Sequence, residues 1–351
     1  MTIPSKKAAA ILVVAVALAG VVMYRLASTP TSHSLTNVSL RLEWYPQAQF
    51  CGYIAAKELG YYRDDGINID LRPAGPDLKP QLTVAGGSDD IGIGVSNQVI
   101  SAESNGVPLK IIAQMFQDSA NRYILKSQNA IKSLKDLKGK KVGLWLGGDE
   151  AEFVAMLKTQ GMTLKDVQVV PQGFSVAPFL EDQYVLSEVT AYNELLEIQS
   201  TGYQGPKLQI LSPADYNSAI VGDMVFTREA FIQQHPDLVK RFLDASMRGW
   251  QYCLAQPQAA IDLVLKENPS LNRSQQIEQL RVVSGLIASG GAVTHGLGYM
   301  DPQYYATATH VLLDSGQIST SVSPQSVFDA TAWQALSSSV TKVPATTITD
   351  R

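Results

Sequence analysis

The fold is decided by residues 42–69, which read LEWYPQAQFCGYIAAKELGYYRDDGINI. This stretch joins the end of one expected strand, Val38–Trp44, to a second, Ile67–Leu71. In both, apolar and polar residues alternate with the period of two that is typical of a half-buried strand. Between them the pattern predicts a helix over Gln49–Tyr61, ending at Gly60, a residue suited to a helix C-terminus. A strand, a helix and a strand in this order predict a βαβ unit with parallel strands.

The same alternation continues along the chain. Further strands are predicted at Asp90–Gly94, Leu109–Phe116, Lys141–Trp145, Val167–Val170, Val185–Thr190 and Leu208–Leu211, and helices at Asp77–Ala85, Asn97–Asn105, Asp149–Gln160 and Tyr192–Ser200. From about Asp223 the chain becomes mostly helical, with helices predicted at Arg228–Gln234, Pro236–Ala255, Pro257–Asn268 and Ser274–Ala288. Strands alternating with helices of this length imply an α/β fold with largely parallel sheets.

Two α/β runs followed by helices predict a two-lobed binding protein with its ligand cleft between the lobes. In such a protein the chain leaves the first lobe and later returns to it. We expect it to cross at Arg122–Lys126 and to return at Ala219–Phe226. The predicted organisation is residues 38–122 and 223–336 for lobe 1, 123–222 for lobe 2, and a flexible, Ser/Thr-rich tail at 337–351.

The first 37 residues have the order of an export signal. Lys6 and Lys7 precede Ala8–Tyr24, a stretch of 17 residues without charge. Ala17–Ala19 fits a cleavage site, but as a helix the stretch would also span roughly 26 Å, so an uncleaved membrane anchor is the alternative. Either interpretation places the body of the protein outside the cytoplasm, in the periplasm or at the cell surface, after a linker at residues 28–37.

The composition excludes several classes of function. The chain has 351 residues, of which 45% are hydrophobic and 17% charged, which excludes a disordered protein. The net charge is -4, and beyond residue 37 there are 25 basic against 32 acidic residues, which argues against nucleic-acid binding. Two cysteines and four scattered histidines lack metal-ligand spacing, and no catalytic motif is present. We therefore expect no metal, no cofactor and no catalytic residue.

The two cysteines leave one question open. Cys51 and Cys253 both stand in apolar helical contexts. In an exported chain they could form a disulfide, but we expect buried free thiols, which is the usual state of cysteines in such surroundings.

Candidate binding residues follow from their places in the pattern, because ligands of open α/β sheets bind outside the C-terminal ends of strands. Aromatic rings at such ends can stack on a flat ligand, and amide and carboxyl groups can hydrogen-bond to it. The candidates are Trp44, Gln47, Gln49, Phe50, Asp77, Asn97, Trp145, Glu150, Tyr192, Asn193 and Glu194 at or after strand ends, and Asp223 at the return crossing.

Each candidate also has a plainer interpretation. Trp44 and Phe50 fit a hydrophobic core, and Asp77 fits a helix N-cap. Glu150 either caps the helix that follows it or accepts a hydrogen bond from a ligand amino group. Asp223 either faces the cleft or is solvated.

Five motifs, in order, resemble those of extracytoplasmic solute-binding proteins of the thiamine-pyrimidine-precursor, nitrate and sulfonate group. They are 42–69, Ser133–Gly143, Tyr192–Glu194, Gly222–Asp223 and Ala245–Tyr252. The resemblance covers about residues 38–335. It implies a periplasmic-binding-protein type II fold that closes on a small molecule and delivers it to the permease of an ABC importer in the membrane. We expect a monomer that binds no nucleic acid.

The resemblance also implies a ligand. In the branch that binds thiamine pyrimidine precursors, aromatic stacking and a carboxylate hold the aminopyrimidine, and Trp44, Tyr192 and Glu194 stand where those roles fall. The run 47–53, QAQFCGY, departs from the Asn/His-containing version of that branch and is more similar to relatives associated with riboflavin-like ligands. We expect a small heteroaromatic vitamin or precursor of the thiamine-pyrimidine kind, with riboflavin-type, sulfonate or nitrate ligands as alternatives.

An enzyme of the same fold is the main rival. The fungal thiamine pyrimidine synthase uses its own histidine and a pyridoxal phosphate held on a lysine. In this chain Gly94 stands where the lysine belongs, and Asn97 and Gln98 stand where the histidine belongs. The synthase's cysteine cluster is also missing near residues 219–226. Since neutral amides cannot form a Schiff base, we predict a binding protein and not an enzyme.

Overall fold

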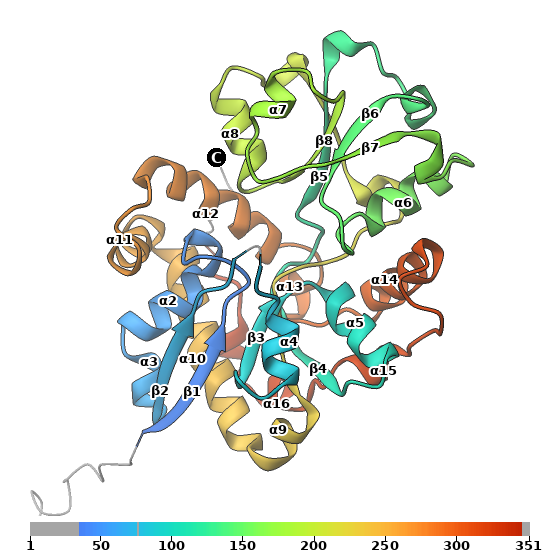
Figure 1. The fold of residues 1–351 in the computed structure, drawn as a ribbon. Helices are drawn as coiled ribbons and strands as arrows, with labels where there is room; N and C mark the ends of the chain where they lie inside the picture. Colours follow the sequence, from blue (N-terminus) through green and yellow to red (C-terminus); the bar gives the residue numbers. More distant parts are fainter. Residues whose placement is uncertain (1–34, 76, 346–351) are drawn as a thin grey trace, which may run out of the picture. The chain divides into compact units, whose positions relative to one another are not determined.

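The computed structural model describes residues 35–75 and 77–345 (Figure 1). The described chain forms one compact unit that begins at Asn37. The predicted signal or anchor segment lies outside the described residues. Among the helices that are described, none is long and apolar enough to cross a membrane.

The first lobe is built on a five-stranded sheet of order β2-β1-β3-β10-β4. Its strands are β1 (Thr36–Arg41), β2 (Ile67–Arg72), β3 (Ile91–Gly94), β4 (Leu109–Gln114) and β10 (Met224–Arg228). β1 and β3 are parallel, whereas β10 runs antiparallel to both β3 and β4. The connecting helices are η1 (Ala48–Phe50), α2 (Cys51–Glu58), α3 (Tyr61–Asp64), α4 (Pro80–Ala85) and α5 (Ser96–Ser104).

The second lobe repeats this plan with the order β7-β6-β8-β5-β9. Its strands are β5 (Asn121–Lys126), β6 (Lys141–Leu144), β7 (Gln168–Pro171), β8 (Leu186–Thr190) and β9 (Leu208–Leu211). β6 is parallel to β7 and β8, and β5 is antiparallel to β8 and β9. The helices are η2 (Ser127–Asn129), η3 (Leu134–Leu137), α6 (Ala151–Lys158), η4 (Leu164–Asp166), α7 (Ala177–Leu180), α8 (Glu194–Ser200), η5 (Gly205–Lys207) and η6 (Pro213–Tyr216).

After β10 the described chain is helical. The helices are α9 (Glu229–Gln234), α10 (Pro236–Ala255), α11 (Pro257–Glu267), α12 (Arg273–Ile287), α13 (Gly290–His295), α14 (Pro302–Ser315), α15 (Pro324–Val327), α16 (Thr331–Gln334) and α17 (Ser338–Thr341). A proline stands in the first turn of α10 and of α11, where its missing N–H costs no helical hydrogen bond.

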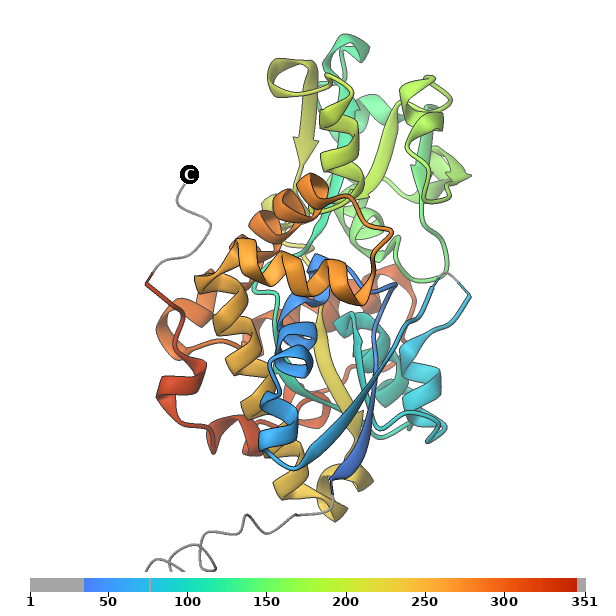
Figure 2. The same ribbon diagram turned by 90° about the vertical axis from the view of Figure 1, so that its left-hand side faces the viewer.

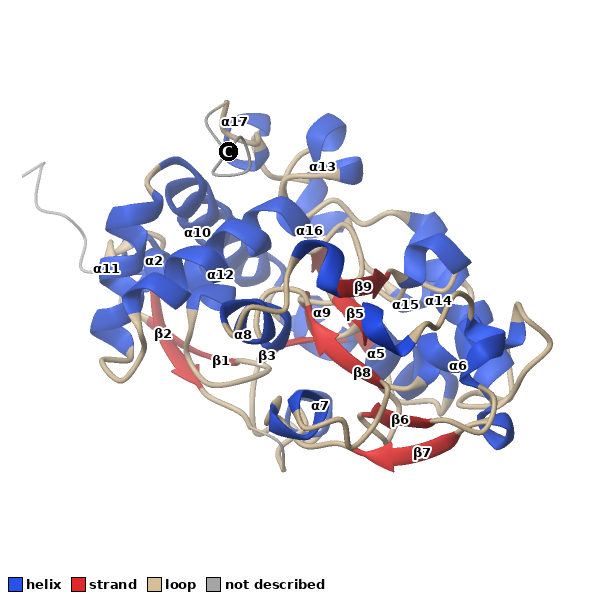
Figure 3. Cartoon of the chain, turned by 90° about the horizontal axis from the view of Figure 1, so that it is seen from above, coloured by secondary structure: helices blue, strands red, loops and turns tan. Residues whose placement is uncertain are grey.

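Each sheet is covered by helices on both faces. In the first lobe, α2, α10 and α12 pack on one face and α5 and α14 on the other, in two separate apolar clusters. In the second lobe, α6 covers one face and α7 and α8 the other (Figure 3). The two-lobed α/β fold that the sequence predicted is therefore present, although the residue boundaries of the lobes stay a prediction.

The structure differs from the predicted elements at two instructive places. The region predicted as the outgoing crossing, 122–126, lies within the antiparallel strand β5, and the last three residues of the predicted return, 219–226, begin the antiparallel strand β10. Beyond Ser337, where a flexible tail was predicted, Ser338–Thr341 forms α17. There the Thr341 carbonyl oxygen accepts a hydrogen bond from the Leu297 N–H at 2.6 Å. Contacts with the first lobe thus order a stretch whose composition is typical of a frayed end.

α2 packs against α10 in the most extensive contact between any two of the described helices (Figures 1 and 2). Two glycines allow it. A Cβ atom at Gly249 would lie 2.0 Å from the Gly52 carbonyl oxygen, and one at Gly52 would lie 2.3 Å from the Trp250 ring. These distances are far below van der Waals contact. The backbone of α2 therefore packs directly on the backbone of α10 and on the Trp250 indole, with no room for another carbon.

This contact also corrects the prediction for the cysteines, which was wrong. Cys51 and Cys253 form a disulfide with their Cα atoms 6.3 Å apart and a separation of 202 positions in sequence. Cys51 adjoins Gly52, and Cys253 lies one helical turn after Gly249 on the same face of α10. The glycine contact therefore brings the two sulfurs together, which the local apolar pattern of either helix cannot reveal.

We expect Gly249→Ala to destabilise the protein by at least about 1–3 kcal/mol, the usual cost of overpacking, because the new methyl group meets backbone rather than a flexible side chain. In an unconstrained helix the same change would stabilise by about 1 kcal/mol. The free energy of unfolding from urea denaturation measures the effect. Gly173→Ala is the control, since a Cβ atom there meets nothing within 4 Å. Equal stability of the two variants would contradict the expectation.

Candidate functional site

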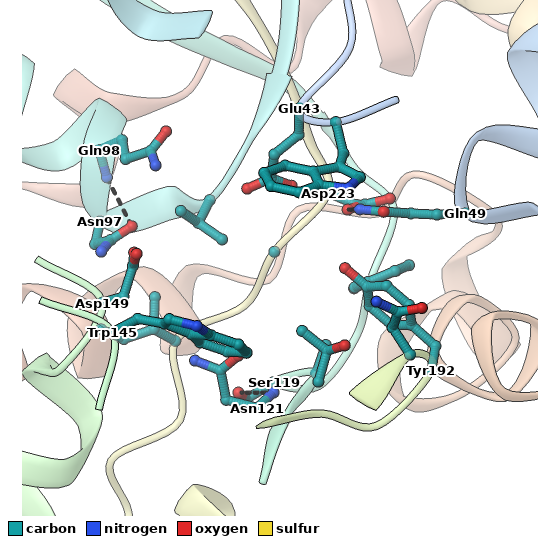
Figure 4. Close-up of a pocket in the computed structure, with 18 of the residues that line it drawn as sticks. Glu43, Gln49, Asn97, Gln98, Ser119, Asn121, Trp145, Asp149, Tyr192 and Asp223 are labelled. Atoms are coloured by element: carbon teal, nitrogen blue, oxygen red, sulfur yellow. Dashed lines mark hydrogen bonds between the residues drawn. The ribbon is translucent and has the colours of Figure 1, made fainter. Parts of the chain in front are cut away.

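A cavity of about 380 Å³ lies between the two lobes and is lined by both (Figure 4). It collects the C-terminal ends of the parallel strands, as in other α/β proteins, together with the starts of the antiparallel strands β5 and β10, which run the opposite way. Its volume is in the range of sites for drug-sized molecules, about 300–1,000 Å³.

Nine of the twelve candidate residues line this cavity. They are Trp44, Gln47, Gln49, Asn97, Trp145, Tyr192, Asn193, Glu194 and Asp223. The residues come from segments up to 179 positions apart in sequence, and the fold brings them to one place. Their roles toward a ligand stay a prediction.

The other three candidates do not line the cavity, and each has a physical reason. Phe50 is fully buried in the core of the first lobe. Asp77 is exposed, and it is not an N-cap, because α4 begins only at Pro80. The Glu150 carboxylate turns back to its own loop, where it accepts the Gly148 N–H at 2.9 Å. The neighbouring Asp149 lines the cavity instead.

Aromatic rings from both lobes meet at the cavity. Trp44, after β1, lies with its ring centroid 4.6 Å from that of Phe174 in the loop after β7. Phe174 is also 6.0 Å from Trp145, nearly parallel to it. The Trp145 ring is held by a hydrogen bond from Nε1 to the Gly173 carbonyl oxygen at 3.2 Å, and its backbone N–H donates to Glu188 at 2.9 Å. The sequence offered no signal for Phe174, which stands in a loop without periodicity.

A chain of glutamine side chains supports the first-lobe wall. Gln279 on α12 donates to Gln47 at 3.3 Å, Gln47 donates to Gln49 at 2.8 Å, and Gln49 donates to Asp223 Oδ1 at 2.8 Å. Gln276 and Gln279 also accept the backbone N–H groups of η1. Every amide in the chain points its NH₂ group toward Asp223, so the polarity of the wall is fixed by α12.

Asp223 is held in an unusual conformation at the start of β10. Its φ of 49° lies in the left-handed region, which is uncommon outside glycine and is adopted most often by asparagine, aspartate and histidine. Only 1% of the residue is exposed, and its Oδ2 atom has no hydrogen-bond partner among the described residues. The carboxyl group of Glu43 lies beside it (Figure 4). Burial raises the pKa of Asp223 to about 7. Burial, followed by the charges of Asp223 and Asp149, raises the pKa of Glu43 well above its ordinary value.

Glu152 is a second buried carboxyl that the sequence reading missed. It lies in the first turn of α6, and its oxygens accept the Asn121 side-chain amide at 2.9 Å and the Ile220 backbone N–H at 2.5 Å. Asn121 is the first residue of β5 and Ile220 belongs to the return crossing, so one carboxyl bonds to both segments. Burial raises the pKa of Glu152 to about 7. From sequence it resembles an ordinary acid in a helical first turn.

Glu194 uses its hydrogen-bonding capacity within its own loop. One oxygen accepts both the N–H and the hydroxyl of Thr190, at 3.0 and 2.6 Å, and the other accepts the Asn193 amide at 2.9 Å. These bonds fix the turn that presents Tyr192, whose ring packs edge-on against Phe116 with centroids 5.8 Å apart.

The charge of the cavity is strongly one-sided. Among the described residues that line it, the acids are Glu43, Asp149, Glu152, Glu194 and Asp223, whereas Lys79 is the only base. Lys79 is exposed at the rim. Neutral amides and hydroxyls supply the remaining polar groups. Such a lining is unfavourable for an anion and suits a neutral or cationic molecule with flat faces.

Comparison with known proteins identifies the family. The family model described as NMT1/THI5 like matches residues 47–260. The chain belongs to this family. The NMT1/THI5-like match begins inside the stretch that decides the fold and ends in α11, so it includes every segment that lines the cavity from Gln47 onward. The predicted family resemblance is thereby confirmed.

Several relatives carry functional names. The riboflavin-binding protein RibY of Chloroflexus aurantiacus is 28% identical over 84% of this chain and 85% of that protein. The formylaminopyrimidine-binding protein of Halalkalibacterium halodurans is 23% identical over 68% of this chain and 73% of that protein. A relative from Legionella pneumophila, 24% identical over 67% of this chain and 75% of its own length, is named 4-amino-5-hydroxymethyl-2-methylpyrimidine phosphate synthase.

Solved structures show the fold. The periplasmic aliphatic sulphonate-binding protein SsuA of Escherichia coli superposes with a TM-score of 0.62 at 16% identity, covering 84% of this chain and 92% of that one. This likeness confirms the periplasmic-binding-protein fold. It says nothing of the ligand, because at this identity only the fold is shared.

The buried carboxyls predict a pH dependence of stability. Glu152 and Asp223 have pKa values of about 7 in the folded protein, against about 4 in an unfolded chain. The folded state therefore holds protons that the unfolded state has lost. The contribution of these two groups to the free energy of unfolding is therefore fully present below about pH 4, and it is lost as the pH rises through about 7.

We expect the free energy of unfolding of the ligand-free protein to fall between pH 5.5 and 8, by up to about 1.4 kcal/mol per pH unit for each fully linked proton. Urea denaturation at a series of pH values measures it. A variant carrying Glu152→Gln and Asp223→Asn should show a flatter profile. An unchanged slope in that variant would contradict the assignment of the protons.

Proposed function

We propose that this protein is the substrate-binding component of an ABC importer and that it carries a flat, uncharged heteroaromatic compound, with riboflavin as the first candidate. The observation that carries the proposal is the cavity between the lobes, in which Trp44, Phe174 and Trp145 offer ring faces. The one base among the described lining residues, Lys79, is exposed at the rim. The 28% identity to a riboflavin-binding protein over most of both chains supports it. So does the glutamine run at 47–49, which differs from the version expected for aminopyrimidines.

A thiamine pyrimidine precursor is the second candidate. The formylaminopyrimidine-binding relative supports it, and so do Tyr192 and Glu194, an aromatic ring followed closely by a carboxylate at the cavity. Sulfonate and nitrate receive no such support, since binding an anion next to five acids without a buried base would be costly.

The role requires an exported protein that closes on its ligand. The disulfide between Cys51 and Cys253 supports export, because such bonds persist in oxidising compartments. Closure would occur by rotation of the lobes about the two crossings, with the ligand favouring the closed state. We also propose that the protein acts as a monomer and hands its ligand to a membrane permease.

The hypothesis that this chain is a pyrimidine synthase fits its residues poorly. Gly94 replaces the lysine that would hold pyridoxal phosphate, and even a Cβ atom at this position would lie 3.1 Å from Gln98 and 3.2 Å from Phe226. Asn97 points to the Gly148 carbonyl oxygen at 3.3 Å and cannot act as the reacting histidine. The residues present therefore do not fit the cofactor, and we propose a binding protein without enzymatic activity.

Thermal denaturation with a small panel of compounds tests the proposal. Riboflavin should raise the melting temperature, since a ligand that binds only the native state at 100 times its Kd stabilises by about 2.7 kcal/mol. The panel also contains 4-amino-5-hydroxymethyl-2-methylpyrimidine, an alkanesulfonate and nitrate. A shift with the pyrimidine alone would favour the second candidate. A shift with sulfonate or nitrate only, or with none, would overturn the proposal.

Two substitutions test the placement of the ligand. Trp44→Ala should weaken riboflavin binding about 5- to 150-fold, the loss of roughly 1–3 kcal/mol of aromatic stacking. Glu194→Ala should also weaken it, because the turn that presents Tyr192 loses three hydrogen bonds.

Isothermal titration calorimetry measures both variants. Tyr45→Ala and Glu197→Ala are matched controls, since these exposed neighbours on the same segments do not line the cavity. Unchanged affinity in the Trp44 and Glu194 variants would show that the ligand binds elsewhere.

A further inference from the structure

We propose that Glu43 and Asp223 act as one unit that holds a single proton and recognises an uncharged ligand edge on which an N–H group adjoins a hydrogen-bond acceptor. This inference rests on the proposed function and names the chemistry of the ligand edge. An imide edge of riboflavin, with N3–H beside a carbonyl oxygen, and the amino and ring nitrogens of an aminopyrimidine both have this form.

The first argument is the hydrogen bonding of Asp223. Gln49 already donates to its Oδ1 atom, and the direction of that bond is fixed by the glutamine chain that begins on α12. Oδ2 is buried and lacks a donor among the described residues, yet the residue lines the cavity. A buried carboxylate oxygen without a donor is costly, by about 1–3 kcal/mol or more. Oδ2 of Asp223 therefore lacks a hydrogen-bond donor, which either a bound proton or a ligand can supply.

The second argument is the position of Glu43. Its carboxyl group lies beside that of Asp223 at the cavity, with Glu43 just after the end of β1 and Asp223 just before the start of β10 (Figure 4). Two carboxylates this close cannot both be ionised at low cost, so they share one proton near neutral pH. A protonated carboxyl next to an ionised one offers a donor and an acceptor side by side, which is the complement of the proposed ligand edge.

The third argument is the backbone at Asp223. Its positive φ is retained at the return crossing, where glycine would adopt it without strain. Strain of this kind persists where the surrounding structure requires it, and it accumulates at binding sites. Holding the Asp223 side chain against Glu43 explains why an acid and not a glycine occupies the position.

Other titratable groups face the pair, and their protonation must be distinguished from that of the pair. They are Asp149 and Glu194 from the second lobe, Tyr192 before α8, Tyr53 on α2, and Lys79 at the rim near Asp149. Burial raises the pKa of Tyr53 and Tyr192 well above 10, so both stay neutral in the range of interest. Glu152 titrates in the same range, but its oxygens already accept bonds from both crossings.

The ligand side of the test uses the wild-type protein. Riboflavin is compared with 3-methylriboflavin, and 4-amino-5-hydroxymethyl-2-methylpyrimidine with its 4-dimethylamino analogue, by isothermal titration calorimetry. Methylation removes the N–H group and leaves the flat ring, so the analogue of the compound that binds should bind at least about tenfold more weakly. Equal affinity of parent and methylated analogue would overturn the inference while leaving the proposed function intact. Binding of neither parent would overturn both.

The protein side of the test uses pH. Because the bound state needs the shared proton, the affinity of the parent compound should fall up to about tenfold per pH unit above pH 7, with uptake of one proton per ligand. Titrations in buffers of different ionisation enthalpy measure that uptake. Asp223→Asn and Glu43→Gln should each remove most of this dependence, since an amide carries its donor at every pH. Asparagine also tolerates the positive φ.

Two controls assign the protons. Glu197→Gln, on an exposed part of α8, should leave both affinity and slope unchanged. Glu152→Gln should leave the pH dependence of affinity unchanged, even if the affinity itself changes. If the pH dependence of affinity disappears in the Glu152 variant and persists in the Asp223 and Glu43 variants, the proton belongs to Glu152 and the inference is overturned. An affinity that is independent of pH in the wild type would also overturn it.

Discussion

The contact on which the first lobe depends is the approach of α2 to α10 through Gly52 and Gly249. With no side chain between them, the two helices come close enough for Trp250 to lie over Gly52 and for the disulfide to form one turn away. The same contact fixes η1, which leads directly into α2, and η1 carries the glutamines of the cavity wall. A packing constraint in the core thus determines the position of the polar groups that a ligand would meet.

The cavity combines two kinds of surface that are seldom found together. Its aromatic rings would bury a flat molecule at little entropic cost, because they have few rotatable bonds. Three of its acids, Glu152, Glu194 and Asp223, are however buried, and the described lining residues include no buried base to balance them. This is tolerable only when the acids are partly protonated or supplied with hydrogen-bond donors. Glu152 and Glu194 receive donors from the protein itself. Glu43 and Asp223 receive fewer hydrogen-bond donors from the protein. This difference distinguishes acids with a structural role from acids that are available to a ligand.

Sequence reasoning located the site but not its inner chemistry. The rule that ligands bind beyond strand ends was enough to find Trp44, Trp145 and Tyr192, because strand ends are visible in the alternation of residues. It could not find Glu43, which in that alternation reads as a solvent-facing position next to Trp44, nor Phe174, in a loop without a pattern. The disulfide and the strands β5 and β10 depend on contacts between segments about 60–200 residues apart in sequence, which periodicity does not encode.

The embedding of β5 and β10 has a mechanical consequence. The outgoing connection leaves the edge strand β4 and enters the inner strand β5, and the return leaves the edge strand β9 and enters the inner strand β10. A bend in either connection therefore acts on an edge strand of one sheet and on an inner strand of the other, so both sheets are attached in the same way. Because Glu152 bonds to Asn121 at the start of β5 and to Ile220 in the return, one carboxyl on α6 couples the two connections to each other.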